Sequence, residues 1–522
     1  MTRLVFVLIG AVLLASCHVG NRLYNPASAR KAGEPPARQS VVAITPNSTQ
    51  PDVVDPACTP TNKACLAFLE FDDMGESWDR RQLPEAIAMI ERATSLPRPP
   101  VVAVFIHGWK NNARNEEGRR NGNVIGFEGI LEYLRQSVYP DSPIVGLYIG
   151  WRGDLIPSYW PVRRQLSYFN RENAAIRVPG PSLTNALVSV ATTAHQRNPG
   201  SYVLMIGHSF GALVLERALS QAMADYALRA SAGSGTTTTP DGGWADLVTY
   251  VNSAAAANEG KQMLDLLKNR SVFLTRDNTG REYPQPLFLS VSSLGDMATR
   301  FALPVGHGPS FLVHKTTGSF RSYAEPDVPQ PPVQAQSAYF TSTVAHMQAL
   351  QSHTVNEGVA CAEGSAPLSP PVSFTLPNTK TYQLCEKGGR WNDTPYWAMQ
   401  VPASVVRNHS SIFTEDLVRL LHVFLPAKEV VADPQRRPRL LAAVTPARAK
   451  AGAAITVRGA RFGATPGSIA VAGQQVTVTE WTDWRIAFTL PSGLAAGQAR
   501  VTLTTSDKGQ TVFPLDSLTV EP

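Results

Sequence analysis

The pentapeptide GHSFG places Ser209 between Gly207 and Gly211, where the sequence pattern changes. The apolar run YVLMI before it predicts a buried strand, and ALVLERALSQAM after it predicts a helix. The pentapeptide matches G-x-S-x-G, in which the glycines permit the sharp strand-to-helix turn that exposes a serine hydroxyl. We therefore predict that Ser209 is the nucleophile of an acyl-transfer reaction. The alternative interpretation is a polar residue at a tight turn.

A nucleophilic serine also requires backbone donors for the developing oxyanion, each worth about 3 to 4 kcal/mol. The strand-like run VVAVFIHGW ends at His107 and Gly108, roughly one hundred residues before Ser209. A loop that follows an earlier strand can complete an oxyanion hole at such a serine. We predict that the backbone amides of Trp109 and Phe210 bind the oxyanion. The alternative is that His107 and Gly108 form a plain strand-ending turn.

The general base must come from the ten histidines of the chain. In the architecture that this strand, turn and helix resemble, the chain order is Ser, acid, His. His409 lies between a strand-like run and the final helix of this part of the chain, where a serine is available as the helix cap. His409 is therefore the predicted base, and His353 and His314 are the competing candidates.

The acid is expected in a loop between the serine and the histidine. Asp296 follows the apolar strand-like run PLFLSVSS and can orient the imidazole and stabilise its cation. Asp277 or Asp241 could substitute for it. Such chemistry needs neither a metal nor an organic cofactor, and no C-x-x-C or His/Cys spacing indicates a zinc site.

Short apolar strands alternate with amphipathic helices around these residues, which predicts an α/β class with a mostly parallel sheet flanked by helices. Two long stretches, 152–182 and 297–395, interrupt the alternation, and we expect them as insertions over the mouth of the site. The first contains an aromatic group around Trp160. Its rings form either an apolar wall for an acyl chain or part of the core.

The motifs FIHGW, GHSFG and NHSSIF, together with Asp296, resemble those of the α/β-hydrolase superfamily across roughly residues 64 to 425. The segments LEFDDMGESW and IGWRGD are similar to bacterial serine-esterase-like members. The resemblance implies an α/β-hydrolase fold over about 61–428. It also implies a carboxylesterase-like or lipase-like activity on carboxylic esters or acyl groups, carried by Ser209, His409 and Asp296.

The chain changes character after a Pro- and Arg-rich linker at 424–440. Segments with period-two alternation, such as AAITVRGARFG and RIAFTLP, are separated by Gly, Pro and Asp turns, which predicts a small immunoglobulin-like β-sandwich over 438–522. The arrangement of its turns and strands resembles an IPT/TIG domain.

The N-terminal pattern predicts an export signal, because the apolar run LVFVLIGAVLLA follows Arg3 and is too short to span a membrane. The run ends in LASC, which resembles the lipobox of bacterial lipoproteins, in which the cysteine is lipidated. The resemblance implies a signal peptide at 1–16, a lipid anchor at Cys17 and a flexible tether over 17–60. It places the chain in the cell envelope, at the outer membrane or periplasm of a two-membrane bacterium. The alternative is an ordinary signal with a chance cysteine.

The four remaining cysteines agree with export, because an even number is expected in an oxidising compartment. Three pairings are open, and the choice by sequence proximity is Cys58 with Cys65 and Cys361 with Cys385. The net charge of +6 is spread without a dense basic run, so a nucleic-acid partner is not expected.

These observations predict a lipid-anchored serine hydrolase whose partners are an ester or acyl substrate and, through its N-terminal lipid, a membrane. The sandwich is expected to contact a protein or glycan partner. One alternative is an envelope interaction or scaffold lipoprotein with an inactive hydrolase domain. Another is an acyltransferase, which would use the same triad.

Overall fold

The computed structural model describes residues 40–44, 53–115, 120–154, 167–198, 200–231, 245–267, 272–276, 282–284, 286–299, 339–377, 379–387, 396–424 and 439–522, apart from gaps at 447, 461, 463–464, 482–484, 507–509 and 513–517. The predicted signal peptide, most of the predicted tether and residues 425–438 of the predicted linker lie outside these ranges. So do several residues singled out above, namely Cys17, Trp160, Asp241, Asp277 and His314.

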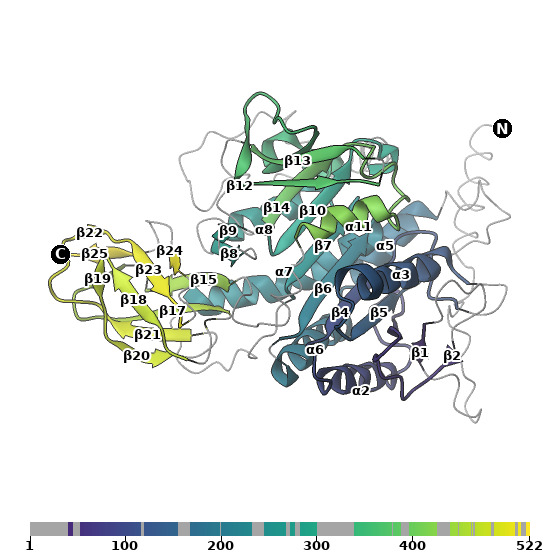
Figure 1. Cartoon of the computed structure of the whole chain (residues 1–522), viewed down its shortest axis with the longest axis horizontal. Coiled ribbons are helices and arrows are strands. Elements are labelled where there is room, and N and C mark those ends of the chain that lie inside the picture. Colours follow the sequence, from purple (N-terminus) through teal and green to yellow (C-terminus); the bar gives the residue numbers. More distant parts are fainter. Residues whose placement is uncertain are drawn as a thin grey trace, which may run out of the picture.

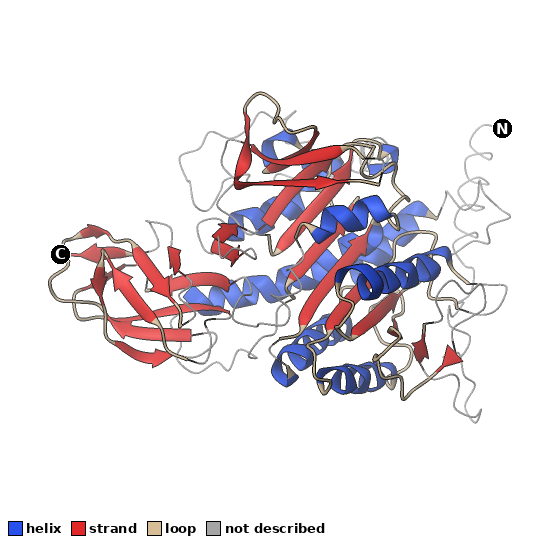
Figure 2. Ribbon diagram, in the orientation of Figure 1, coloured by secondary structure: helices blue, strands red, loops and turns tan. Residues whose placement is uncertain are grey.

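The larger part of the molecule is built on one mixed sheet with helices on both faces (Figures 1 and 2). Its parallel strands lie in the order β3 (Cys65–Glu70), β5 (Ile144–Gly150), β4 (Val101–Ile106), β6 (Tyr202–His208), β7 (Leu247–Val251), β10 (Phe288–Ser293), β14 (Tyr396–Val401) and β11 (His353–Glu357). Antiparallel strands close the two edges: β1 (Val41–Ala43) and β2 (Val53–Val54) beside β3, and β13 (Thr381–Lys387) and β12 (Ser365–Thr375) beside β11.

Strand β4 shows why the central strands are continuously apolar. Its residues Val102, Val104 and Ile106 pack in one core cluster, and Val101, Ala103 and Phe105 pack in another. The first cluster includes residues of α2 (Gln82–Thr94), α5 (Tyr168–Arg177), α6 (Pro181–Arg197), α7 (Phe210–Ser231) and α8 (Ala257–Leu267). The second includes residues of α3 (Gly122–Tyr133), its π-helical continuation η1 (Leu134–Val138) and α11 (Glu415–His422). Because both faces of the sheet are covered, alternation of polar and apolar residues is lost.

The tether prediction is wrong at its C-terminal end. Val41 is fully buried in β1, which pairs antiparallel with β3, and β2 pairs with β1. The run VVA is too short to stand out in a Pro- and Ser-rich context. It becomes a strand only because β3 supplies the hydrogen-bonding edge.

The predicted insertion at 297–395 also differs from expectation, because its described part extends the sheet. Strands β11, β13 and β12 form one edge of the sheet, away from β6, the strand that precedes Ser209. Strand β12 contains Pro367 and has a register shift between Pro367 and Val372. An outermost strand tolerates proline and a bulge, since one of its sides needs no ladder partner. The prolines of β12 are the reason why its composition did not predict a strand.

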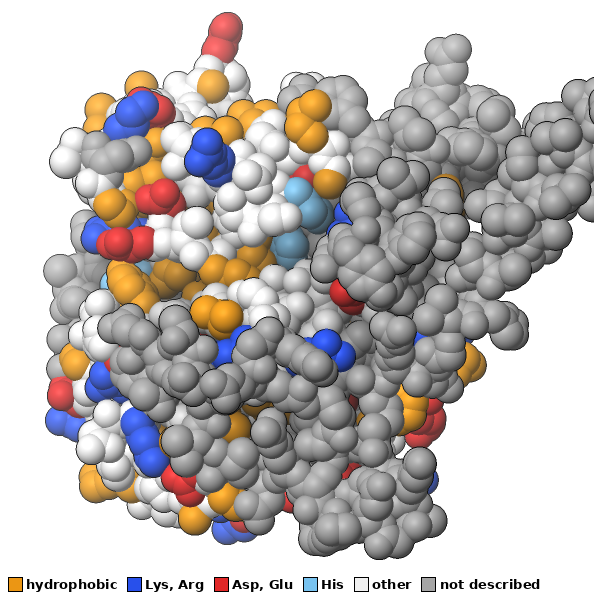
Figure 3. All heavy atoms as spheres, turned by 90° about the vertical axis from the view of Figure 1, so that its right-hand side faces the viewer, with side chains coloured by type: hydrophobic (Ala, Val, Ile, Leu, Met, Phe, Trp, Pro, Cys, Tyr) orange, Lys and Arg blue, Asp and Glu red, His pale blue; other side chains and the backbone are white. Residues whose placement is uncertain are grey.

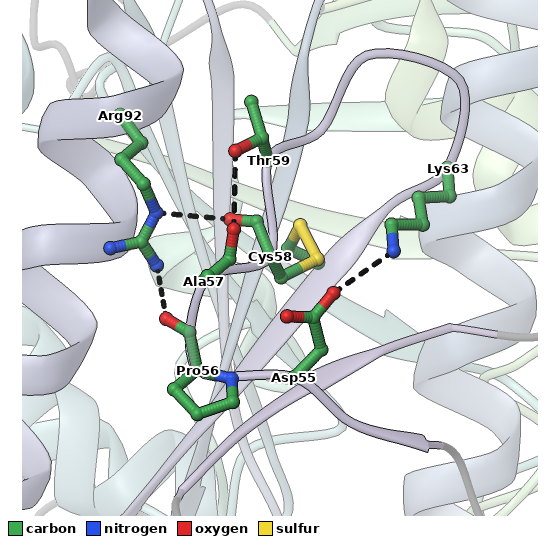
Figure 4. Close-up of a disulfide and its surroundings, with 8 residues drawn as sticks. Asp55, Pro56, Ala57, Cys58, Thr59, Lys63 and Arg92 are labelled. Carbon is green, nitrogen blue, oxygen red and sulfur yellow. Dashed lines mark hydrogen bonds and ion pairs between the residues drawn. A yellow bond between two sulfur atoms is a disulfide. The ribbon is translucent and has the colours of Figure 1, made fainter.

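Two disulfides follow the pairing by sequence proximity, and that prediction is confirmed. Cys58 bonds Cys65 at the start of β3, with Cα atoms 6.0 Å apart, and Cys361 bonds Cys385 of β13, with Cα atoms 5.8 Å apart. Around the first disulfide, Arg92 of α2 donates to the carbonyl oxygens of Pro56 and Cys58 (Figure 4). These bonds fasten the segment before β3 to the helix beside it.

The C-terminal part is a β-sandwich at one end of the molecule (Figure 1). One sheet contains β20 (Val478–Trp481), β21 (Arg485–Thr489), β17 (Ala454–Ala460) and β15 (Arg439–Thr445), and a second contains β19 (Gln474–Gln475), β18 (Ser468–Val471), β23 (Val501–Thr504) and β24 (Gln510–Val512). A third, small sheet contains β16 (Arg448–Lys450), β25 (Thr519–Glu521) and β22 (Gly497–Gln498). Their inward residues, among them Ile455, Ile469 and Val501, form a separate core.

The sandwich is joined to the α/β part by backbone pairing that the sequence did not predict. A hairpin of β8 (Val272–Arg276) and β9 (Glu282–Pro284) adds to the edge of the first sandwich sheet, where β8 pairs antiparallel with β15. Helix α7 also contacts β15. The sandwich therefore does not stand apart from the α/β part.

The described residues include no helix with both the length and the apolar character that a bilayer crossing requires. They also include no group of three or more metal-ligating side chains.

One carboxyl of α7 is buried in the core. Glu216 is 1% exposed and accepts a hydrogen bond from the hydroxyl of Tyr396 at 2.9 Å. Burial, and to a lesser extent the neighbouring charge of Glu259, raise the pKa of Glu216 to about 8. The native state therefore favours the protonated carboxyl.

We expect Glu216 to make the protein less stable as the pH rises. Its native pKa lies above the ordinary value of 4.5, so the stability that the proton provides is complete below pH 4.5 and is lost as the pH approaches 8. Glu216→Gln, which keeps an acceptor for Tyr396, is expected to raise the free energy of unfolding at pH 8 by on the order of 4 kcal/mol. Urea unfolding at pH 4.5 and pH 8 measures this. Glu363→Gln, at an exposed loop residue, is the control, and equal curves for wild type and Glu216→Gln at pH 8 would contradict the expectation.

Candidate active site

Ser209 lies at the junction between β6 and α7, in a backbone conformation that L-residues rarely adopt. Its φ is 56°. The flanking glycines are required by the close packing of this turn. A Cβ on Gly207 would lie 2.6 Å from the Cα of Ala212, and a Cβ on Gly211 would lie 2.1 Å from the carbonyl oxygen of Ile106. The sequence GHSFG therefore encodes a strained turn at this position.

The loop after β4 reaches the same turn. A Cβ on Gly108 would lie 2.7 Å from the Cβ of Ser209, so only glycine permits this approach. Among the described residues, no acceptor is found for the backbone amides of Trp109 and Phe210. These two amides, one from each of the adjoining segments, are the predicted oxyanion donors.

Three side chains from three loops form one hydrogen-bonded row. The Nε2 atom of His409 lies 2.8 Å from the Oγ of Ser209, and its Nδ1 atom lies 2.9 Å and 3.0 Å from the two carboxylate oxygens of Asp296. Asp296 follows β10 and His409 follows β14, so each group leaves the carboxyl end of a parallel strand. A carboxylate only accepts hydrogen bonds, so Nδ1 carries the proton and Nε2 can accept from the serine hydroxyl.

Asp296 is fully buried but remains ionised. Burial alone would raise its pKa, but the hydrogen bond and charge of His409 and the hydroxyl and amide of Thr299 outweigh burial and lower it. The hydroxyl of Thr299 donates to one carboxylate oxygen at 2.6 Å, and the amides of Ala298 and Thr299 donate to the other. These donors hold the carboxylate in place beneath the imidazole.

The competing histidine that the structure describes lies elsewhere. His353 belongs to β11, is 1% exposed, and stacks on Trp397 with ring centroids 3.7 Å apart. Its Nδ1 atom contacts the hydroxyl of Ser352. The structure thus brings Ser209, Asp296 and His409 together and leaves His353 in the core.

The loop after β4 is held by His107 and Trp151, two residues to which the sequence analysis gave no such role. The Nε2 atom of His107 accepts from the amide of Trp151 at 3.1 Å, and the indole of Trp151 donates to the carbonyl oxygen of His107 at 2.7 Å. Burial lowers the pKa of His107 to about 4. The neutral ring fastens the β4 loop to the loop after β5. The motif FIHGW shows His107 in the sequence, but its partner Trp151 is visible only in the fold.

An aromatic cluster borders the serine turn. Trp109 meets Tyr168 edge to face, and Tyr168 packs against Phe210, with ring centroids 5.4 Å and 5.2 Å apart respectively. The indole nitrogen of Trp109 donates to the hydroxyl of Ser167 at 3.0 Å, and Phe169 is 53% exposed. Ser167, Tyr168 and Phe169 belong to the predicted insertion at 152–182, so its described part does lie beside the site. Trp160 is outside the described residues.

Figure 3 shows the face of the molecule on which histidine side chains reach the surface, with hydrophobic side chains gathered beside them. The side chain of His409 is 23% exposed, whereas Ser209 is only 6% exposed. The imidazole is therefore the accessible member of the row.

The C-terminal sandwich can be assigned to a family. The model of the IPT/TIG domain matches residues 440–520. These residues are an IPT/TIG domain. The prediction for 438–522 is confirmed to this extent, and the match covers only this part of the chain.

No curated protein matches the chain in sequence. Among solved structures, a putative phosphatase from Bacteroides thetaiotaomicron has 20% identity, with 14% of this chain and 16% of that chain covered and a TM-score of 0.12. SGBP-B of the Bacteroides ovatus mixed-linkage glucan utilization locus, in complex with a mixed-linkage heptasaccharide, has 15% identity, with 30% and 34% covered and a TM-score of 0.12. Gamma-CGTase from alkalophilic Bacillus clarkii has 9% identity, with 85% and 70% covered and a TM-score of 0.16.

The chain spans about a sixth of the length of the phosphatase and about a third of that of SGBP-B. At these TM-scores the likenesses carry no argument about the fold or activity of this chain.

Proposed function

We propose that this protein is a serine hydrolase of the α/β-hydrolase superfamily that cleaves carboxylic esters or acyl groups. The observation that carries the proposal is the hydrogen-bonded row from the buried carboxylate of Asp296 through His409 to Ser209. The chain order Ser, Asp, His and the turn at Ser209 between a parallel strand and a helix support the assignment.

In the proposed reaction, the Oγ atom of Ser209 attacks the carbonyl carbon of the ester while His409 accepts the hydroxyl proton at Nε2. Asp296 stabilises the resulting imidazolium, and the amides of Trp109 and Phe210 stabilise the oxyanion. Collapse of the tetrahedral intermediate breaks the bond to the alcohol, which leaves with the proton from His409. Water then attacks the acyl-serine by the same route and releases the carboxylic acid. The residues of this chain suffice for each step.

The aromatic cluster supports an ester with an apolar acyl part. Trp109 and Phe210 supply both the oxyanion amides and ring faces beside the nucleophile, so an acyl group held by those amides would lie next to the rings.

The envelope location and the anchor at Cys17 are part of the same proposal. They rest on the sequence LASC and on the two disulfides, which are typical of an oxidising compartment. A protein or glycan partner of the sandwich is likewise proposed from its domain type.

A fluorophosphonate probe tests the proposal directly, since it reacts covalently with an activated serine. We expect the purified mature chain to be labelled and the Ser209→Ala variant to remain unlabelled. Equal labelling of both would reject Ser209 as the nucleophile. An unlabelled wild type that also leaves a panel of acyl esters intact would favour the scaffold alternative. Product analysis in the presence of an alcohol separates a hydrolase from an acyltransferase.

A further inference from the structure

The residue directly before the serine, His208, contacts the loop that carries His409. Its Nε2 atom lies 2.7 Å from the backbone carbonyl oxygen of His409, 201 residues further along the chain. A carbonyl oxygen only accepts, so Nε2 of His208 must carry the proton and donate. His208 is 4% exposed, so water does not compete freely for this bond. The end of β6 is thereby tied to the loop after β14.

A second donor reaches the same carbonyl oxygen. The Nδ2 atom of Asn252 lies 3.2 Å from it, and the Oδ1 atom of Asn252 accepts from the amide of Ser293 at 3.0 Å. Asn252 follows β7 and has a φ of 46°, which is a rare conformation for a residue other than glycine. The His409 carbonyl is therefore held from two neighbouring strand ends, while Asp296 holds the ring of the same residue.

The donor ring is neutral. Burial, and next the proximity of His409, lower the pKa of His208 to about 3. The two rings are 5.0 Å apart, so a charge on His208 would disfavour the imidazolium that His409 forms during catalysis. The Nδ1 atom of His208 is buried with no hydrogen-bond partner among the described residues, which is a cost to the fold. An apolar side chain of similar size would leave no buried nitrogen unpaired. The hydrogen bond from Nε2 to the carbonyl oxygen of His409 is therefore what a histidine contributes at this position.

We propose that His208 is a positioning residue for the acyl-transfer reaction, whose Nε2–H holds the carbonyl oxygen of His409 and thereby keeps the imidazole within reach of both Ser209 and Asp296. This inference rests on the proposed function of Ser209. A displacement of about 1 Å in a reacting group lowers rates about a hundredfold. The effect should appear in kcat, because the side chain of His208 is buried and offers little surface to a substrate.

Two variants of similar size separate the hydrogen bond from packing. His208→Met fills the space without a donor, and we expect kcat for an acyl ester to fall about 30- to 100-fold while KM changes less than about threefold. His208→Gln places an amide N–H near the position of Nε2 and is expected to recover kcat to within about fivefold of wild type. The matched control is His353→Met, at another buried histidine that lies away from the row. This control is expected to keep the wild-type kcat.

The proposal is overturned if folded His208→Met has the wild-type kcat, or if His208→Gln loses as much as His208→Met. Should the methionine variant not fold, nitrogen NMR of the histidine-labelled wild type gives an independent answer. His208 is expected to stay neutral with its proton on Nε2 from about pH 5 to pH 8, and a charged or Nδ1-protonated ring would refute the bond. If the proposed serine-hydrolase function is itself wrong, the result is distinguishable, because wild-type turnover would then be absent or unaffected by Ser209→Ala.

Discussion

Ser209→Ala is expected to lower kcat for an acyl ester by about five to six orders of magnitude, with little change in KM. Alanine removes the nucleophile but leaves the amides of Trp109 and Phe210 in place. The residual rate over water should therefore be about 10³- to 10⁴-fold, supplied by these donors and by substrate binding. Steady-state kinetics with a chromogenic ester measure kcat, and circular dichroism verifies that the variant keeps the secondary-structure content of the wild type.

The double variant Ser209→Ala/His409→Ala adds a stricter test of this expectation. If the two side chains act as one unit, the double variant should lose about as much as either single variant. Additive losses would show that they act separately. Ser292→Ala is the matched control, because the hydroxyl of Ser292 is fully buried in β10 and has no partner among the described residues. This control should retain the wild-type kcat.

Asp296→Asn is expected to lower kcat by about four orders of magnitude at neutral pH. The asparagine amide can donate to Nδ1 of His409, which stabilises the tautomer with the proton on Nε2. That tautomer cannot accept the proton of Ser209, whose Oγ lies 2.8 Å from Nε2. The same chromogenic ester measures the loss. Asp416→Asn, at a partly exposed residue of α11, is the control, and an Asp296→Asn variant within tenfold of wild type would contradict the role assigned to Asp296.

The lowered pKa of Asp296 also sets the pH range in which it stabilises the fold. Because the native pKa lies below the ordinary value of 3.8, the stabilising contacts of the carboxylate are present above pH 3.8 and are lost as the pH falls further. The difference in free energy of unfolding between wild type and Asp296→Asn should therefore shrink at strongly acidic pH. This direction is opposite to that expected for Glu216, so the two carboxyls are separable by pH.

The candidate site was accessible to sequence analysis because its signals are local. Gly207, Ser209 and Gly211 form a recognisable pentapeptide, and Gly207 is required by contacts within five residues, although Gly211 is required by the carbonyl oxygen of Ile106 on a neighbouring strand. Asp296 and His409 each follow an apolar strand, and parallel strands present their carboxyl ends at one edge of a sheet. The pairing of that aspartate with that histidine was one choice among several, and the structure brings these two together.

Contacts without a local signal escaped prediction. Nothing near His208 in the sequence indicates that its ring reaches the carbonyl of His409, and nothing near Trp151 indicates that it braces His107. Strands β1 and β8 are short and pair with β3 and β15, which lie further along the chain, whereas β12 contains prolines and pairs with the adjacent strand β13. Their formation depends on edges that other segments provide.

The sequence by itself determined the elements whose information is carried within a window of some ten residues: the buried strands, the serine turn, the period-two sandwich strands and the disulfide loop from Cys58 to Cys65. Only the tertiary structure decided which histidine meets Ser209, which segments extend the sheet, and how the sandwich is joined to the α/β part. The physical reason is that a side-chain row or a strand edge forms between groups that are 22 to 200 residues apart in these examples. The free energy of such contacts depends on distances between the groups. The complete fold sets these distances, and a short segment of the sequence does not determine them.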